Sequence, residues 1–280
     1  MIVPIVYFSS SNNTAYIARI IAKGLESEGI SPGLVKVEDA GAGRCGLTQA
    51  TVLGIGAPIY GGFAEPIKYW AKSFDFSGKK VFLFSTAGIF HFGSTKEMIR
   101  LVEGRGGKVL GALEVTFRGA MDGIFFMRWQ AERNPIRKAD LERSLQFGRD
   151  IGRIARTGEG YADSTYRHRF GGLTLGIIKA VKDVVLPIVK RAFFEETCGL
   201  CVNCAACEKV CPVDAIRAKG ECVEIDRDRC IACFRCFKAC PKGALSLRFA
   251  DKLEYYRGPW QLKGYVKPEE LAREQPSSGQ

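Results

Sequence analysis

Eleven cysteines are the side chains of this 280-residue chain with the clearest capacity for chemistry, and eight of them fall into two runs. Both runs have the form C-x-x-C-x-x-C-x-x-x-C-P, and the second repeats the first 29 residues further along the chain. A C-x-x-C-x-x-C turn can wrap three thiolates around one iron–sulfur cluster, so the fourth thiolate comes from elsewhere. The repeat therefore predicts two iron–sulfur clusters. Their candidate ligands are Cys201, Cys204, Cys207, Cys211, Cys230, Cys233, Cys236 and Cys240.

The region around residues 198–250 resembles a two-cluster bacterial ferredoxin, because both runs keep the spacing of that family through the Cys-Pro pair. The resemblance implies that the fourth cysteine of each run ligates the cluster of the other run. The implied sets for two [4Fe-4S] clusters are Cys201, Cys204, Cys207 and Cys240, and Cys230, Cys233, Cys236 and Cys211. The alternative is a pair of zinc sites, which is disfavoured because closed zinc sites usually take their four ligands as separated pairs.

Three cysteines stand outside the repeat. Cys198 has cluster-like spacing to Cys201, but the residue 29 positions after it is Arg227, so we interpret Cys198 as a spare thiol near a cluster. Cys222 lies in a stretch of alternating polarity and is expected to be a packed strand thiol. Cys45 has no motif around it, and the sequence assigns it no role.

Polar residues near the start of the chain form a second candidate site. The segment SSSNNT, residues 9–14, stands between an apolar run and a helical pattern. Hydroxyls, side-chain amides and free backbone N–H groups before a helix can cradle a phosphate without any cationic side chain. The alternative interpretation is an ordinary N-capping loop rich in serine and asparagine.

This loop resembles the phosphate loop of flavodoxins, whose pattern is hydroxyl-x-hydroxyl-Gly-Asn-Thr, with Asn12 in place of the glycine. Asparagine tolerates the left-handed backbone better than most residues. Two later loops resemble the flavin-flanking loops of the same family, and Tyr60 is the expected ring contact. The resemblance implies FMN bound by Ser9, Ser11, Asn12, Asn13, Thr14, Pro58, Ile59, Tyr60, Gly61, Thr86, Ala87, Gly88 and His91. Two alternatives stay open: a flavodoxin-like fold that has lost its flavin, and a His91 that only lines the lip of the pocket.

The elements that would position these residues alternate between strand and helix over the first 117 residues. The apolar runs 2–8, 52–59, 81–84 and 109–117 predict buried strands, and helical spacing occurs between them and again over 137–156. Such alternation predicts a parallel sheet covered by helices on both faces. The flavodoxin resemblance implies the strand order 2-1-3-4-5, with FMN at the carboxyl ends of the strands. The expected fold class is thus α/β, doubly wound, with a second, smaller α+β ferredoxin-like domain.

The length of the chain is about twice that of a usual domain, and its composition shifts abruptly near residue 195. With 46% hydrophobic and 25% charged residues, the chain is not of the disordered class. The expected divisions are an FMN domain at 1–156, a basic amphipathic connector at 157–194, a two-cluster domain at 195–250 and a C-terminal tail at 251–280. The connector is too charged to span a bilayer; packing against a domain is the favoured interpretation, and an interfacial helix is the alternative.

The whole architecture is similar to the fused flavodoxin-ferredoxin proteins of anaerobic microbes. That similarity implies a low-potential electron-transfer protein that passes electrons between FMN, two clusters and a redox partner. The alternative is an FMN-dependent reductase of a small substrate, with residues 118–129 as a candidate lid; no catalytic residue is assigned. No export signal is evident, so a cytoplasmic location is expected.

The charge of the chain bears on its partners. The formal charge of +11 falls to about +7 once two clusters of charge −2 are included. A basic chain of this kind favours a redox partner with an acidic docking surface. No nucleic-acid partner is expected, and contact with a membrane surface is not favoured.

Overall fold

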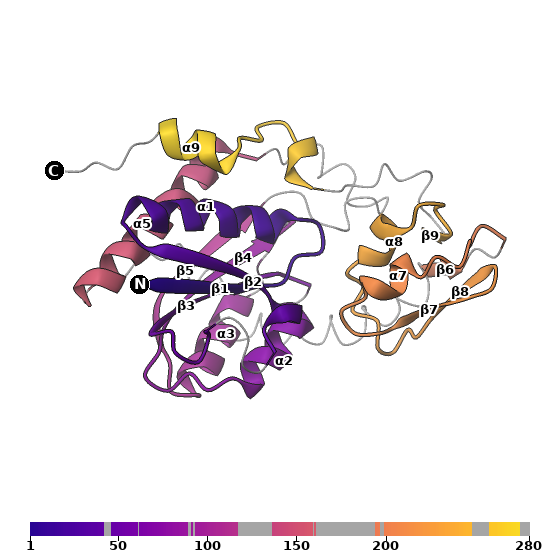
Figure 1. Ribbon diagram of the computed structural model, residues 1–280, viewed down its shortest axis with the longest axis horizontal. Helices are drawn as coiled ribbons and strands as arrows, with labels where there is room; N and C mark the ends of the chain where they lie inside the picture. The colour runs from indigo at the N-terminus through magenta and orange to yellow at the C-terminus, as the bar shows by residue number, and fades with distance from the viewer. Residues whose placement is uncertain are drawn as a thin grey trace. The chain divides into compact units, whose positions relative to one another are not determined.

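The computed structural model shows two compact units (Figure 1). It describes residues 1–41, 46–60, 62–88, 91, 93–116, 136–158, 160, 194–196, 199–247 and 258–274. The first unit holds the described residues up to 160 together with residues 258–274, and the second holds those between 194 and 247. Most of the expected connector and the whole candidate lid lie outside the described residues.

A five-stranded parallel sheet forms the centre of the first unit. Its strands are β1 (Ile2–Tyr7), β2 (Ser31–Lys36), β3 (Val52–Pro58), β4 (Lys80–Ala87) and β5 (Lys108–Thr116). Their order is β2-β1-β3-β4-β5, and every pair is parallel. This is the order of the flavodoxin-like fold, so the fold class predicted from the sequence is confirmed. Only β2, an edge strand of mixed polarity, has no apolar run in the sequence to predict it.

Helices cover both faces of this sheet. They are α1 (Asn13–Ser27), α2 (Glu65–Ser73), α3 (Ser94–Glu103) and α5 (Lys138–Thr157), with a short 3-10 helix, η1 (Val37–Asp39). Helices α1 and α5 lie on one face, and α2 and α3 lie on the other (Figure 1). Two glycines let α1 and α5 pack at backbone contact. A Cβ on Gly24 would lie 2.3 Å from the Leu145 carbonyl oxygen, and one on Gly148 would lie 2.2 Å from that of Ile21.

The core of the first unit explains why these residues form a buried sheet. Strand β3 is buried at every position, as expected for a central parallel strand with helices on both faces. Its two internal glycines lie under aromatic rings of β4. A Cβ on Gly54 would meet the ring of Phe82 at 2.4 Å, and one on Gly56 would meet that of Phe84 at 2.0 Å. The rings thus occupy the space that the glycines leave.

The C-terminal strap, residues 258–274, belongs to the first unit although it follows the second along the chain. It contains the 3-10 helix η2 (Pro259–Gln261) and α9 (Pro268–Glu274), and Figure 1 shows α9 beside α1 and α5. Leu271 is fully buried in the core that α1 and α5 share. This differs from the tail expected over residues 251–280. The strap is too short for a helical period to show in the sequence, and its burial depends on residues 250 positions away.

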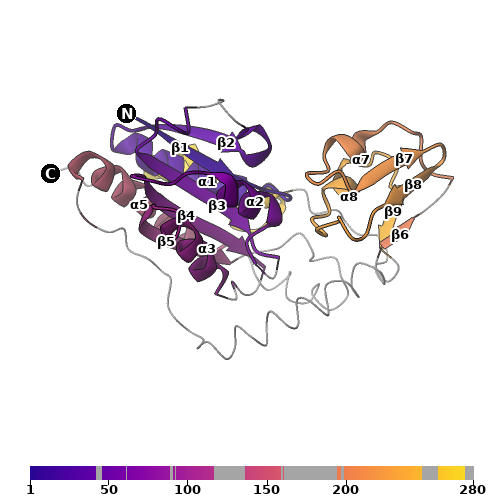
Figure 2. The same cartoon turned by 90° about the horizontal axis from the view of Figure 1, so that it is seen from below.

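The second unit is small and built from two similar halves (Figure 2). Helix α7 (Ala206–Lys209) and helix α8 (Arg235–Ala239) occupy corresponding places in the two cysteine runs. Strand β6 (Phe194–Glu196) pairs antiparallel with β9 (Leu245–Leu247), and β7 (Ile216–Lys219) pairs antiparallel with β8 (Cys222–Ile225). A compact apolar cluster that includes Ile216, Val223, Ile225 and Phe237 lies between them. The expected α+β architecture is confirmed.

A membrane-spanning helix would have to be long and continuously apolar. No helix among the residues that the structure describes meets both conditions.

Candidate functional site

One cavity of the second unit collects the first set of four cysteines. It has a volume of about 330 Å³, part of it open to solvent. The cysteines that line it are Cys201, Cys204, Cys207 and Cys240. Three come from the first run and the fourth from the second, so the chain folds the two runs against each other. Leu200 and Val202, on either side of Cys201, are half exposed.

A second cavity of about 380 Å³ collects the other four cysteines. They are Cys211, Cys230, Cys233 and Cys236. Here the single cysteine from the first run joins three from the second. Ile216, Ile225 and Phe234 complete an apolar lining. The structure therefore brings together both four-cysteine sets that the ferredoxin resemblance implies.

The backbone of both runs is shaped to surround a negatively charged group. Asn203 and Ala205 have φ of 51° and 54°, and the equivalent residues 29 positions later, Ala232 and Phe234, have 54° and 58°. These left-handed residues turn backbone N–H groups toward sulfur. The N–H of Asn203 donates to Cys201 Sγ, and that of Ala232 to Cys230 Sγ, at 3.4 Å in each case. Positive φ in residues other than glycine is costly and concentrates at functional sites.

The fourth cysteine of each run receives a similar hydrogen bond. The N–H of Ala215 donates to Cys211 Sγ, and that of Ala244 donates to Cys240 Sγ, both at 3.2 Å. Hydrogen bonds to sulfur are one of the ways in which a protein tunes the potential of an iron–sulfur cluster. Each cavity thus has at least two such donors, arranged alike.

Burial makes two thiols of the second cavity poor thiolates on their own. It raises the pKa of Cys233 to about 11, and it raises the pKa of Cys236 well above the usual value, with neighbouring cysteines adding to the shift. A cation bound among them would reverse this preference, because a coordinated thiol loses its proton to the metal. The donor set and its apolar surroundings therefore fit an iron–sulfur cluster.

The cysteines outside the repeat divide differently from the expectation. Cys222, expected as a packed strand thiol, is disulfide-bonded in the structure, and its partner lies outside the described residues. It is the first residue of β8 and only partly buried, so its side chain can reach a neighbouring segment. Cys45 and Cys198 lie outside the described residues.

In the first unit, the segment before α1 adopts the backbone that a phosphate loop requires. Asn12 has φ of 61° in the left-handed region, where the flavodoxin pattern has glycine. Asn13 and Thr14, the first residues of α1, are buried, and so is Ser11. Ser9 Oγ accepts a hydrogen bond of 3.3 Å from the N–H of Ala15. The polar groups of the loop therefore lie close to the positive end of the helix dipole.

Hydrogen bonds join this loop to the two loops expected to flank a flavin. Thr14 Oγ1 and Thr86 Oγ1 share one of 2.8 Å, and the hydroxyls of Ser10 and Tyr60 share another. The N–H of Ile59 donates to the Thr86 carbonyl at 2.9 Å. Three loops far apart in sequence thus meet at the carboxyl ends of β1, β3 and β4. Ser10 was missing from the expected site residues because the family pattern leaves its position open.

The remaining expected residues surround the same meeting point. Pro58 ends β3 and accepts a hydrogen bond from the N–H of Ala64, while Ala87 ends β4 and Gly88 follows it. Gly61 lies outside the described residues. The ends of β3 and β4 therefore border the region between Tyr60 and Thr86.

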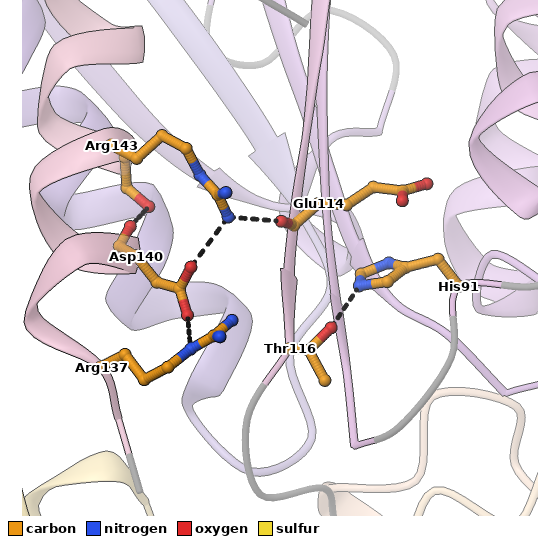
Figure 3. Close-up of polar contacts among 7 residues, drawn as sticks. His91, Glu114, Thr116, Arg137, Asp140 and Arg143 are labelled. Carbon is orange, nitrogen blue, oxygen red and sulfur yellow. Dashed lines mark hydrogen bonds and ion pairs between the residues drawn. The ribbon is translucent and has the colours of Figure 1, made fainter. Parts of the chain in front are cut away.

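His91 holds two strands together from a buried position. Its Nδ1 lies 2.7 Å from Ser85 Oγ of β4. Its Nε2 lies 3.1 Å from Thr116 Oγ1 of β5 (Figure 3). Burial, aided by the charge of Arg143, lowers the pKa of His91 to about 4, so the ring is neutral at ordinary pH. The expected role was a contact with FMN. That contact stays a prediction; in the structure, both ring nitrogens have hydrogen-bonding partners within the protein.

A network of charged groups at the start of α5 reinforces the same edge of the sheet. Asp140, which is buried, accepts hydrogen bonds from Arg137 Nε at 2.8 Å and from Arg143 Nη2 at 2.9 Å. Arg143 Nη2 also donates to the Glu114 carbonyl at 3.2 Å (Figure 3). Burial raises the pKa of the Glu114 carboxyl, and a hydrogen bond from Thr95 partly opposes that shift. No motif in the sequence indicates this network, because its members come from three elements.

Comparisons with known proteins give one family match and several similar solved structures. Residues 200–244 match the family model described as a 4Fe-4S dicluster domain. The chain is 18% identical to a flavodoxin from the domain Archaea, over 56% of this chain and 99% of that one, with a TM-score of 0.45. It is 20% identical to oxidised flavodoxin 2 from Bacillus cereus, over 56% of this chain and 99% of that one, with a TM-score of 0.43. A search of curated protein sequences found no match.

A third similar structure is the two-electron reduced flavodoxin of Megasphaera elsdenii, 24% identical over 40% of this chain and 85% of that one, with a TM-score of 0.38. The strand order establishes the flavodoxin-like fold without these distant similarities. The chain therefore joins a flavodoxin-like unit to a 4Fe-4S dicluster domain.

Proposed function

We propose that this chain is an electron-transfer protein with FMN in its first unit and a [4Fe-4S] cluster in each cavity of its second. FMN exchanges one or two electrons and each cluster exchanges one, so the chain would hold up to four reducing equivalents and divide electron pairs into single electrons. The observation that carries the proposal is the pair of four-cysteine cavities, each lined by cysteines of both runs.

The side chains of the second unit would hold the clusters and adjust their potentials. Four sulfurs in each cavity supply the ligands, and backbone N–H groups such as those of Ala215 and Ala244 stabilise negative charge on them. Cys204 of the first cavity is exposed, whereas every cysteine of the second cavity is at least partly buried. Exposure and hydrogen bonding both affect cluster potential, so the two clusters are expected to differ.

The loops of the first unit would bind the flavin by its phosphate and its ring. The hydroxyls and backbone N–H groups at the start of α1 offer hydrogen-bond donors to a phosphate, and the helix dipole favours its charge. Tyr60 and Thr86, which are hydrogen-bonded to Ser10 and Thr14 of the phosphate loop, would supply the ring contacts that the flavodoxin resemblance implies. The meeting of the three loops supports FMN as the ligand.

Anaerobic reconstitution with iron, sulfide and FMN tests this proposal. We expect about eight irons and eight acid-labile sulfides per chain, because eight cysteines form two four-ligand sets. We also expect one FMN, released by acid and identified by its mass. Four irons or stoichiometric zinc would contradict the cluster assignment, and a chain that cannot be loaded with FMN would contradict the flavin assignment separately.

A redox partner with an acidic docking surface completes the proposal. It is supported by the formal charge of +11, which remains clearly positive after two clusters are counted. Assays of the same reconstituted protein against candidate acceptors and donors would identify the partner and the direction of electron flow. The cytoplasmic location expected from the sequence stays a prediction.

A further inference from the structure

The C-terminal strap returns the chain from the second unit to the helix that begins at the candidate phosphate loop. Tyr16, in the first turn of α1, donates from its hydroxyl to the Val266 carbonyl at 2.6 Å. Its ring lies 5.2 Å from that of Tyr265, measured between ring centroids. Tyr265 and Val266 of the strap thus contact Tyr16, which follows Asn13 and Thr14 by three and two residues along α1.

Further contacts anchor the strap along its length. Leu271 is completely buried among the α1 and α5 side chains. Lys138 Nζ donates to Glu274 Oε2 at 2.9 Å, which ties the end of α9 to the start of α5. Gly264 has φ of 86°, and a Cβ there would lie 2.4 Å from the Ile136 carbonyl oxygen. The strap backbone therefore lies directly on the first unit at this residue, where no side chain would fit.

Because the strap is bound to the first unit, the lengths of the two connecting segments limit the distance between the units. Ten residues, 248–257, separate the end of β9 from the strap, and eleven Cα–Cα steps reach at most about 40 Å. On the other side, 36 residues, 158–193, separate α5 from β6, and that tether could reach about 130 Å. Without the bound strap, only the long segment 158–193 would join the two units. With the strap bound, the short segment 248–257 joins them as well.

We propose that the C-terminal strap is a second tether that keeps the iron–sulfur unit within electron-transfer reach of the flavodoxin-like unit. This inference rests on the proposed function. Effective concentration falls as the span open to a tether grows, so a connection that reaches at most about 40 Å confines the cluster unit more closely than one that reaches about 130 Å. The face of α1 and α5 is thus covered by a segment of the same chain. Because the strap is bound there, the short connection limits how far the cluster unit can move from the first unit.

A protease site inserted between residues 247 and 258 of the full reconstituted chain tests the tether. Cleavage breaks the short connection, while the strap stays packed on α1 and α5 through its own contacts. After flavin photoreduction, we expect flavin-to-cluster electron transfer to slow severalfold on cleavage, with FMN and iron content unchanged. The uncut protein is its own control. An unchanged rate would overturn the proposal, whereas a failure to load FMN or clusters before cleavage would contradict the proposed function instead.

Two uncleaved variants and a measurement independent of activity complete the test. Leu271→Asp places a charge in the buried contact and should release the strap, while Trp260→Ala, a change at a half-exposed strap residue, should not. Small-angle scattering should show a larger maximum dimension for the cleaved chain and for Leu271→Asp, but not for Trp260→Ala. Equal dimensions in all forms would overturn the tether.

Discussion

The two units assemble their candidate sites in opposite ways. In the second unit, all eight candidate cluster ligands lie within 40 consecutive residues, from Cys201 to Cys240, and the ferredoxin resemblance of their spacing implies how they group. In the first unit, the site depends on hydrogen bonds across long stretches of chain, such as Thr14 to Thr86. A metal site on short loops can therefore be interpreted from local spacing, whereas a site at the ends of parallel strands requires the sheet.

The sharpest way to break this comparison is to remove cysteines in pairs. Cys201→Ala with Cys240→Ala empties two ligand positions of one cavity, so we expect about four of eight irons to remain. Cys201→Ala with Cys211→Ala removes one ligand from each cavity and should lose most of both clusters, although both residues belong to the same run. Iron analysis of the anaerobically purified variants measures the difference. The opposite ranking would mean that each run holds its own cluster.

In the first unit, the largest single effect is expected from the titration of His91. Its pKa is about 4 in the folded chain against 6.5 for the unperturbed group, so the unfolded chain binds more protons between these values. The stability that neutral His91 provides is complete above about pH 6.5 and is lost as the pH falls toward 4, up to about 3 kcal/mol.

Chemical unfolding of the apo-protein at a series of pH values measures this effect. His91→Gln keeps hydrogen-bonding capacity at the same place but does not titrate, so its stability should fall less between pH 6.5 and 4. Carboxylates titrate in both proteins, so their contribution cancels in the difference. Parallel stability curves for the two proteins would show that His91 does not have the depressed pKa.

The contrast between the units also separates what the sequence could predict from what it could not. Buried parallel strands and the helix at residues 137–156 follow from local periodicity, and both cysteine sets follow from spacing that resembles a two-cluster ferredoxin. The strap, the disulfide at Cys222 and the buried His91 do not, because no local motif or periodicity indicates the residues that each one contacts. His91 resembles a loop residue in sequence, and only the pairing of β4 with β5 places Ser85 and Thr116 beside its two nitrogens.

A smaller effect is expected from the hydroxyl that joins two loops of the first unit. Thr14→Val keeps the shape of the side chain but removes its hydrogen bond to Thr86 and one donor at the helix start. Loss of a hydrogen bond to a charged phosphate is worth about 1.5–3 kcal/mol, so FMN affinity should fall at least about tenfold. Fluorescence titration of FMN measures it. Thr157→Val, the same change at the exposed end of α5, should leave affinity unchanged; equal losses would place the phosphate elsewhere.

The smallest expected effect concerns where the positive charge of the chain acts. Residues 199–247 contain eight Lys and Arg against six Asp and Glu, so two clusters would bring this region to about −2. The basic charge available to an acidic partner therefore lies outside the cluster unit, and the connector supplies part of it. Its lysines Lys179, Lys182 and Lys190 lie outside the described residues, so their role is predicted from sequence alone.

Reversing the charge of these three lysines should slow electron exchange with an acidic partner severalfold at low salt and have little effect at high salt, because peripheral charges mainly set encounter rates. Stopped-flow kinetics over a range of ionic strength measures this. Reversal of Lys209, Lys238 and Lys242 in the cluster unit is the matched control. If both triple variants lose the same rate at low salt, the partner responds to the charge of the whole chain, and the connector has no special part in docking. A larger loss from the connector would instead show that the partner approaches the cluster unit across the segment that joins it to the flavodoxin-like unit.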